Sequence, residues 1–190
     1  MAKRVYFAFH YQDVIDFRAN VVRNHNFTKG VEGAGYYDHS IWEESQKKGD
    51  LSLKRMINTE LGNTSVTSIL IGSHTYYRRW VRYEIMKSIE RGNKIFGVHI
   101  NGIKGRDQLT KPLGANPFEY LGLQISDDGK RGMPTVWDGQ RWAWYSDLDP
   151  FNITEQPIDK RGKNFQLSHW FPTYNWNTDD GYNNFNDWVN

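Results

Sequence analysis

The sequence predicts an α/β protein with a parallel sheet of about five strands, helices on both faces, and an aromatic-rich C-terminal addition with a β-hairpin. Two observations predict the core: short apolar runs alternate with segments of helical periodicity, and the connections between them are short. A third predicts the addition, because six of the eight tryptophans lie beyond residue 100. We expect a core over residues 1–126 and an extension over residues 127–190 packed on it, together forming a single domain.

The composition is typical of a globular protein. The 190 residues are 38% hydrophobic and 24% charged, enough for one full core. The absence of cysteine excludes disulfide frameworks, thiolate metal sites and cysteine nucleophiles. Residues 1–100 carry 15 Lys/Arg against 10 Asp/Glu, which is compatible with an anionic ligand and equally with an ordinary mixed surface. No apolar run reaches the length of a membrane span, so we expect a cytoplasmic protein without membrane contact.

The first third of the chain predicts a strand, a helix and a glycine-rich loop. Val5–Phe9 is a short apolar run, and apolar residues then recur at helical spacing from Asp13 to about residue 24. Asp13 is placed to cap that helix. The glycine-rich segment 28–38 predicts a loop that approaches a ligand closely, with a weak strand signal at Tyr36–Tyr37.

The middle of the chain alternates regularly between helical and strand patterns. Two apolar runs predict strands covered on both faces, and two amphipathic segments predict helices. In chain order the expected elements are a helix from Asp50 to Gly62, a strand over 66–71, a helix over 78–91, a strand over 94–100, a helical turn over 117–121 and a last strand over 121–126.

The segment after residue 126 predicts a β-hairpin. Asp138-Gly139 lies between two short runs that contain Trp137 and Trp142, and Asp-Gly supplies the positive φ of a tight turn. We interpret the surrounding aromatic residues as an addition that packs on the core.

Ligands of parallel sheets bind outside the carboxyl ends of the strands. This rule selects Phe9 and His10 after the first strand, Asp38 in the glycine-rich loop, Ser73 after the central strand, and residues 99–101 after the next one. The six histidines show no metal-ligand spacing, so we expect no metal site.

Glu84 is the acidic residue of greatest interest. On the predicted helix 78–91, Val81, Ile85 and Ile89 form the apolar stripe, and Glu84 lies about 100° from its centre. A carboxylate at that position either looks into a cleft or is an ordinary solvated glutamate. Trp80, one turn earlier on the same face, either stacks on a ligand or packs into the core.

These segments resemble the Toll/interleukin-1 receptor (TIR) domain family, which has a flavodoxin-like sheet. That family has an apolar strand ending in Ser, a loop, and then a Trp and a Glu at the start of a helix, matched here by Ser73, Trp80 and Glu84. The segment Phe7-Ala-Phe-His10, the glycine-rich segment with Asp38, and the strand 95–100 follow the same order. The resemblance covers about residues 3–125.

A closer resemblance is to the TIR-like sensors of the bacterial Thoeris anti-phage system. It is carried by residues 3–18, by Trp80–Ile89 and by the C-terminal segment 179–190, so it spans nearly the whole chain. The aromatic addition then belongs to this subgroup. One departure from TIR domains in general is Phe9-His10, where many members have a small Ser and an aromatic residue, so the mouth of the site has a different shape.

The resemblance implies an enzyme that cleaves NAD⁺ at the nicotinamide–ribose bond and cyclises the product to a cyclic ADP-ribose isomer. That isomer is a second messenger for a companion effector, and a phage-derived trigger starts its synthesis. NAD⁺ is the substrate, so no cofactor is expected, and self-assembly stays open. Glu84 would stabilise the oxocarbenium-like ribose. The expected substrate-binding residues are Phe7, Phe9, His10, Asp38, Trp42, Ser73 and Trp80.

Other functions fit the sequence less well. A phosphoacceptor receiver needs an Asp where this chain has Ser73. A flavodoxin needs a Ser/Thr-rich phosphate loop after its first strand, and the segment 10–13 of this chain, His-Tyr-Gln-Asp, is not such a loop. Gly-x-Gly-x-x-Gly and P-loop motifs are missing. Scattered basic pairs such as Lys47–Lys48 give little support for nucleic-acid binding. The main alternative is a non-enzymatic TIR-like module that acts by homotypic assembly, which fold alone does not exclude.

Overall fold

The structure, a computed structural model, describes residues 3–28, 33–34, 44–45 and 47–190. Its centre is a five-stranded sheet in the order β10-β4-β3-β1-β2, with every neighbouring pair parallel. This order agrees with the predicted flavodoxin-like α/β class. The strands are β1 (Val5–Phe9), β2 (Gly33–Ala34), β3 (Val66–Ile71), β4 (Lys94–His99) and β10 (Thr173–Asn175).

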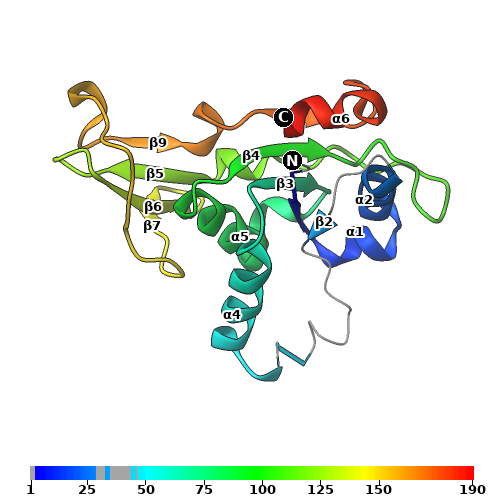
Figure 1. Ribbon diagram of the computed structural model, residues 1–190, viewed down its shortest axis with the longest axis horizontal. Coiled ribbons are helices and arrows are strands. Elements are labelled where there is room, and N and C mark those ends of the chain that lie inside the picture. Colours follow the sequence, from blue (N-terminus) through cyan, green and yellow to red (C-terminus); the bar gives the residue numbers. More distant parts are fainter. Residues whose placement is uncertain (1–2, 29–32, 35–43, 46) are drawn as a thin grey trace.

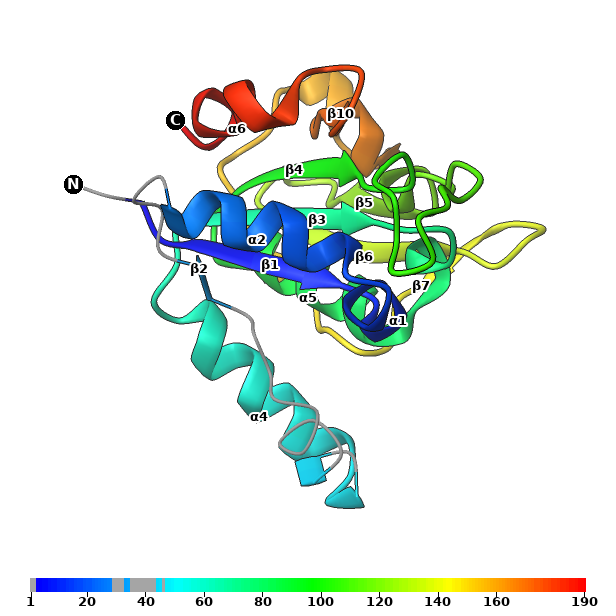
Figure 2. The same cartoon turned by 90° about the vertical axis from the view of Figure 1, so that its right-hand side faces the viewer.

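Helices cover both faces of this sheet, as predicted (Figures 1 and 2). One hydrophobic cluster joins the sheet to α4 and α5, and a second joins the opposite face to α2 and α6. In both views α4 extends away from the sheets. The helices are α1 (Tyr11–Ile15), α2 (Arg18–Thr28), α4 (Asp50–Leu61), α5 (Arg79–Glu90) and α6 (Gly181–Val189). None of those in the described ranges is long and apolar enough to cross a membrane.

The middle elements confirm the sequence prediction closely. Helix α4 ends at Gly62, as expected, and α5 and β4 lie within one residue of their predicted bounds. All six residues of β3 are buried, as its continuous apolar run predicts. The short helical turn is the 3₁₀ helix η2 (Pro117–Glu119), and a second one, η1 (Thr75–Tyr77), precedes α5.

The last predicted strand does not belong to the parallel sheet. Leu121–Ile125 forms β5, which pairs antiparallel with its neighbours in a second sheet of order β7-β6-β5-β9. The fifth parallel position is filled by β10 instead, so the parallel sheet uses residues on both sides of position 126. The short connection 126–130 gives the reason: β6 follows β5 almost directly, and strands joined by a short turn pair antiparallel, whereas parallel neighbours need a longer crossover.

The predicted hairpin is present in this second sheet. Trp137 at the end of β6 (Arg131–Trp137) pairs with Trp142 at the start of β7 (Trp142–Trp144). Gly139 has φ 105° in the four-residue loop between them. The remaining elements of this region are β8 (Phe151–Asn152), η3 (Ile158–Lys160), β9 (Asn164–Gln166) and η4 (Leu167–His169).

The first predicted helix is two helices. Phe17 has φ 65°, a left-handed conformation that separates α1 from α2. Asp13 is not a cap, because it lies inside α1 and is 3% exposed. Its carboxylate packs against Gly72 so closely that a Cβ there would overlap it. The strand expected at Tyr36–Tyr37 lies outside the described residues.

The C-terminal segment completes the core on the α2 side of the sheet. The Phe185 ring of α6 stacks on Phe7 at 5.9 Å and meets Phe96 edge-on at 5.6 Å. Trp188 stacks on Tyr174 of β10 with centroids 4.3 Å apart. The chain end is therefore part of the main hydrophobic core.

Candidate active site

Glu84 lies in the second turn of α5 and is 5% exposed. The interpretation as an ordinary solvated glutamate is therefore wrong. The predicted apolar stripe is present, with Val81 and Ile85 buried, but Tyr83 and Met86 are buried as well. A helical wheel assumes that a helix is packed on one face, so it places Glu84 at the edge of the stripe. Helix α5 is instead covered on several sides by other elements, and Glu84 is buried with them.

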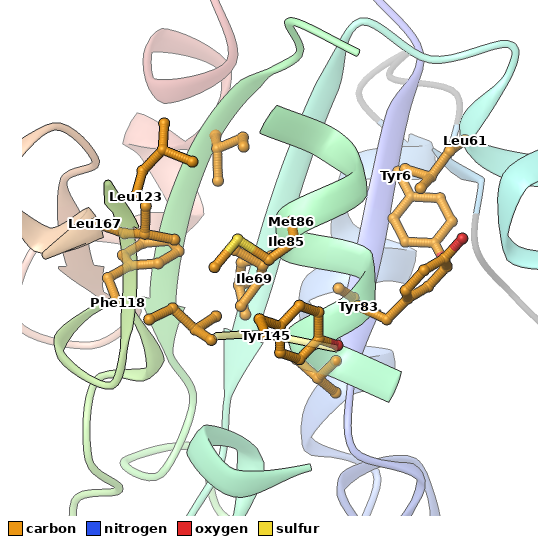
Figure 3. Close-up of a cluster of buried hydrophobic side chains, with 14 of the residues drawn as sticks. Tyr6, Leu61, Ile69, Tyr83, Ile85, Met86, Phe118, Leu123, Tyr145 and Leu167 are labelled. Atoms are coloured by element: carbon orange, nitrogen blue, oxygen red, sulfur yellow. The ribbon is translucent and has the colours of Figure 1, made fainter. Parts of the chain in front are cut away.

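The carboxylate of Glu84 accepts a hydrogen bond from Tyr6. The Tyr6 hydroxyl lies 2.6 Å from Glu84 Oε1, and this contact is buried. Figure 3 shows Tyr6 of β1 beside Leu61 of α4 and Tyr83 of α5. Tyr6 does not stand out in the sequence, because Val5–Phe9 forms one continuous apolar run. Strand alternation is the signal that separates Tyr6 and Ala8 on one face from Phe7 on the other.

Burial raises the pKa of Glu84 to about 8, and the Tyr6 hydrogen bond acts in the opposite direction. The carboxyl group is thus held close to the neutral pH range, where it can change its ionisation state. An ordinary glutamate has a pKa near 4.3 and is fully ionised at pH 7. Carboxyl groups with a strongly raised pKa are more frequent at functional sites than elsewhere.

Trp80 shares the Glu84 face of α5 and packs partly into the protein. Its ring meets Tyr83 edge-on at 6.1 Å, and the Arg79 guanidinium lies 4.7 Å above it. It is half-buried against the hydrophobic cluster that contains Tyr83 and Val81. Much of the indole therefore contributes to packing, and the remainder is accessible.

Phe7 and Phe9 lie on the other side of the sheet from Tyr6. Phe7 is 1% exposed and stacked on Phe185, so its ring does not face Glu84. Phe9 packs on the same side and has the Arg23 guanidinium 5.5 Å above its ring. Phe7 and Phe9 were expected to bind the substrate, but neither ring lies on the Tyr6 side of the sheet, where Glu84 is, because alternate residues of a strand point to opposite faces.

A polar cluster lies at the carboxyl ends of β1 and β3. Ser73 Oγ donates to the carbonyl of Pro112 at 3.2 Å and accepts from Asn101 Nδ2 at 3.1 Å. Burial lowers the pKa of His10 to about 4, and Arg78 is the next cause. The sheet thus brings His10 and Ser73 to one edge, in agreement with the rule that selected them.

Asp147 of the second sheet's connecting loops links the starts of α4 and α5. Its carboxylate accepts two hydrogen bonds from Arg79, each 2.8 Å, and lies 3.2 Å from Lys54 Nζ. Arg79 also donates to Asp50 at 2.6 Å. These contacts lower the pKa of Asp147, so it stays ionised and links α4 to α5, the helix that carries Glu84.

Two expected substrate-binding residues, Asp38 and Trp42, lie outside the described residues. Within the described ranges, no group of three or more His, Asp or Glu side chains is arranged to hold a metal ion. A cavity of about 370 Å³ opens on the second sheet, lined by Gln124, Thr135, Arg141, Trp142, Ala143 and Trp144. None of the predicted site residues lines it.

Comparison with known proteins gives two matches. The family model described as "Thoeris protein ThsB, TIR-like domain" matches residues 6–104, a range that includes Tyr6, Ser73 and Glu84. A Bacillus cereus (strain MSX-D12) protein named "Putative cyclic ADP-D-ribose synthase ThsB1" is 56% identical over 192 residues, covering 100% of both chains.

Proposed function

We propose, from the premise that this chain belongs to the family of Thoeris ThsB proteins with a TIR-like domain, that it is an enzyme that cleaves NAD⁺ and cyclises the ADP-ribose product. The bond broken is the one between nicotinamide and ribose. The observation that carries the proposal is Glu84, a buried carboxyl group hydrogen-bonded to Tyr6 at 2.6 Å within the matched range. The name of the 56% identical relative supports the cyclic product.

Glu84 acts by electrostatic stabilisation. Loss of nicotinamide leaves positive charge on the ribose, as in glycoside cleavage, and an ionised carboxylate at low dielectric stabilises that charge strongly. The nicotinamide ring of NAD⁺ is already cationic and leaves as a neutral molecule, so a general acid is not needed. Exclusion of water lets a nucleophile of the same ADP-ribose molecule capture the cation, which gives a cyclic product.

The other predicted residues have supporting roles in this proposal. The accessible part of Trp80 offers a ring for stacking beside Glu84. His10 and Ser73, at the carboxyl edge of the sheet, offer hydrogen bonds to polar parts of the nucleotide. Phe9 precedes His10 in the chain. Asp38 and Trp42 complete the expected set.

The cellular role follows from the chemistry of the product. A cyclic ADP-ribose isomer diffuses, so the enzyme communicates with a companion effector through the messenger. A phage-derived trigger activates synthesis in the cytoplasm, where NAD⁺ is available. Self-assembly of the chain is compatible with this role.

The test is Glu84→Gln. Purified protein is incubated with NAD⁺, with and without lysate of phage-infected cells, and the nucleotides are analysed by mass spectrometry. We expect the substitution to lower cyclic product at least about 100-fold, because it removes the charge that stabilises the ribose cation. Thermal unfolding checks that the variant folds. Glu119→Gln is the control, since Glu119 is exposed on η2.

Two results would contradict the proposal. Undiminished product from the Glu84→Gln protein would remove Glu84 from catalysis. No product from the native protein under any condition, including with the phage lysate, would instead favour a non-enzymatic module that acts by assembly.

A further inference from the structure

We infer that Tyr6 is a positioning residue of this site, and that its hydroxyl orients the Glu84 carboxyl group and stabilises the ionised form of that group relative to the protonated one. This inference rests on the proposed catalytic role of Glu84. It extends that role to a residue of a different element, β1, and it predicts how activity depends on pH.

The contact has the geometry of a short, strong hydrogen bond. The distance from the Tyr6 hydroxyl to Glu84 Oε1 is 2.6 Å, within the range of about 2.5–2.7 Å typical of O–H···O⁻ bonds. Tyr6 is 0% exposed and Glu84 is 5% exposed, so little water competes for either group.

The rigidity of β1 makes Tyr6 suitable for positioning. Its backbone pairs in register with Ala34 of β2 on one side and Thr67 of β3 on the other. The ring therefore projects from a fixed point of the central sheet toward α5. The backbone of Glu84 is held as well, since its main-chain carbonyl accepts a hydrogen bond from Ser88 Oγ at 2.6 Å.

The charged groups of α5 and of the elements packed on it either pair with other groups or lie on the surface. Lys54 of α4 contacts Asp147, and Arg55 is exposed. At the start of β4, Lys94 is exposed. On α5 itself, Lys87 pairs with Glu90. The other titratable groups on α5, on those packed elements or next to β1 are Lys3, Arg4, His10, Asp50, Glu60, Tyr76, Tyr77, Arg79, Arg82, Tyr83 and His99.

The histidines are separated from Glu84 along the strands. His10 follows Tyr6 by four residues, about 13 Å of extended chain, and His99 lies at the same end of the sheet. Among the described residues, burial and the Tyr6 hydrogen bond are the causes that act on the ionisation of Glu84. Loss of the Tyr6 hydroxyl should therefore change that ionisation directly.

The direction of the change follows from which form Tyr6 favours. A donated hydrogen bond stabilises the carboxylate, so its removal raises the pKa of Glu84 above its present value of about 8. If the ionised form is the active one, kcat/KM rises with pH through the pKa of Glu84 in the free enzyme. Without Tyr6, that rise occurs at higher pH.

The experiment compares Tyr6→Phe with Tyr83→Phe. Both substitutions remove one hydroxyl, but Tyr83 donates to Asn58 Oδ1 at 3.1 Å and not to Glu84. We measure kcat/KM for NAD⁺ from pH 6 to pH 10. We expect Tyr6→Phe to move the midpoint of the rise upward by about 1 pH unit, with about tenfold lower activity at pH 7. Tyr83→Phe should leave the midpoint unchanged.

A second substitution tests the same bond in the opposite direction. Replacing Tyr6 by 3-fluorotyrosine makes the phenol a stronger donor without removing it, so the midpoint should move to lower pH. This variant also serves if Tyr6→Phe does not fold.

The outcomes separate this inference from the proposed function. Equal activity loss at every pH, or an unchanged midpoint in both Tyr6 variants, would overturn the role of Tyr6 while Glu84→Gln still abolishes product. Full activity of Glu84→Gln would overturn the catalytic role of Glu84 itself.

Discussion

Among the described residues, the carboxyl groups of Asp13 and Glu84 are buried, and burial opposes the ionisation of both. Glu84 has a hydroxyl donor in Tyr6. Asp13 Oδ2 is buried without a hydrogen-bond partner in the described part of the chain, and burial raises the pKa of Asp13 to about 6. Lys111 acts in the opposite direction but does not cancel the effect.

Asp13→Asn should therefore change the pH dependence of stability. The folded pKa of about 6 exceeds the ordinary value of 3.8, so the contribution of Asp13 to stability is lost as pH rises from about 4 to 6. Asparagine does not titrate there. Between pH 4 and pH 7 the free energy of unfolding of the Asp13→Asn variant should therefore increase relative to that of the native protein by about 2 kcal/mol.

Urea unfolding at pH 4, 5, 6 and 7 measures this difference. Parallel curves for the two proteins would show that Asp13 has the same pKa in the folded and unfolded states.

Glu84 and Tyr6 differ in how far the sequence predicts them as parts of the site. Glu84 was identified from its place after the Ser73 strand and from the family pattern, but its burial was not, because the sequence does not state which elements cover α5. Tyr6 was missed, since its partner is 78 residues away in the chain. Contacts at that separation depend on the packing of β1 against α5.

At the scale of elements, Asp147 makes an ion-paired link between α4 and α5. The Asp147 side chain is 10% exposed, and it accepts from Arg79 and Lys54 together. Loss of its charge leaves two cations without their shared partner at the start of both helices, and this is destabilising.

Asp147→Asn should lower the free energy of unfolding by about 2 kcal/mol, because hydrogen bonds to charged groups are worth about 1.5–3 kcal/mol. The matched control is Glu155→Gln, which removes an ion pair between Arg161 and a Glu155 side chain that is 56% exposed. That change should cost less than about 1 kcal/mol. Equal effects of the two substitutions, measured by urea unfolding, would contradict a structural link at Asp147.

Element boundaries were predicted well where one periodicity runs without interruption, as in α4, β3 and α5. The break between α1 and α2 was not predicted. It depends on the left-handed conformation of Phe17, which no glycine or proline marks in the sequence. The buried Arg18 just after it donates to the carbonyls of Ile103 and Leu109, so a distant loop stabilises the start of α2.

At the scale of the whole molecule, the C-terminal segment is part of the central core. β10 extends the parallel sheet beside β4, and α6 covers the face opposite α5 (Figures 1 and 2). Phe185 is 1% exposed between Phe7 and Phe96.

Phe185→Ala should therefore lower the free energy of unfolding by about 3–5 kcal/mol, as for other buried Phe→Ala changes. The control is Trp144→Ala, because Trp144 is 62% exposed on β7 and its loss removes little buried area. Thermal unfolding of the two variants gives the comparison. A small effect at Phe185 would show that the C-terminal helix is peripheral to stability.

Periodicity and short motifs are local properties, so the sequence alone predicts the alternation of helices and strands, the α/β class and the Asp-Gly hairpin. The catalytic role of Glu84 stays a prediction that rests on the family resemblance. Only the tertiary structure decided that Thr173–Asn175 is the fifth parallel strand, that Leu121–Ile125 belongs to a second sheet, and that Tyr6 meets Glu84. These features depend on contacts between residues far apart in the chain, and such contacts are selected by how whole faces pack together.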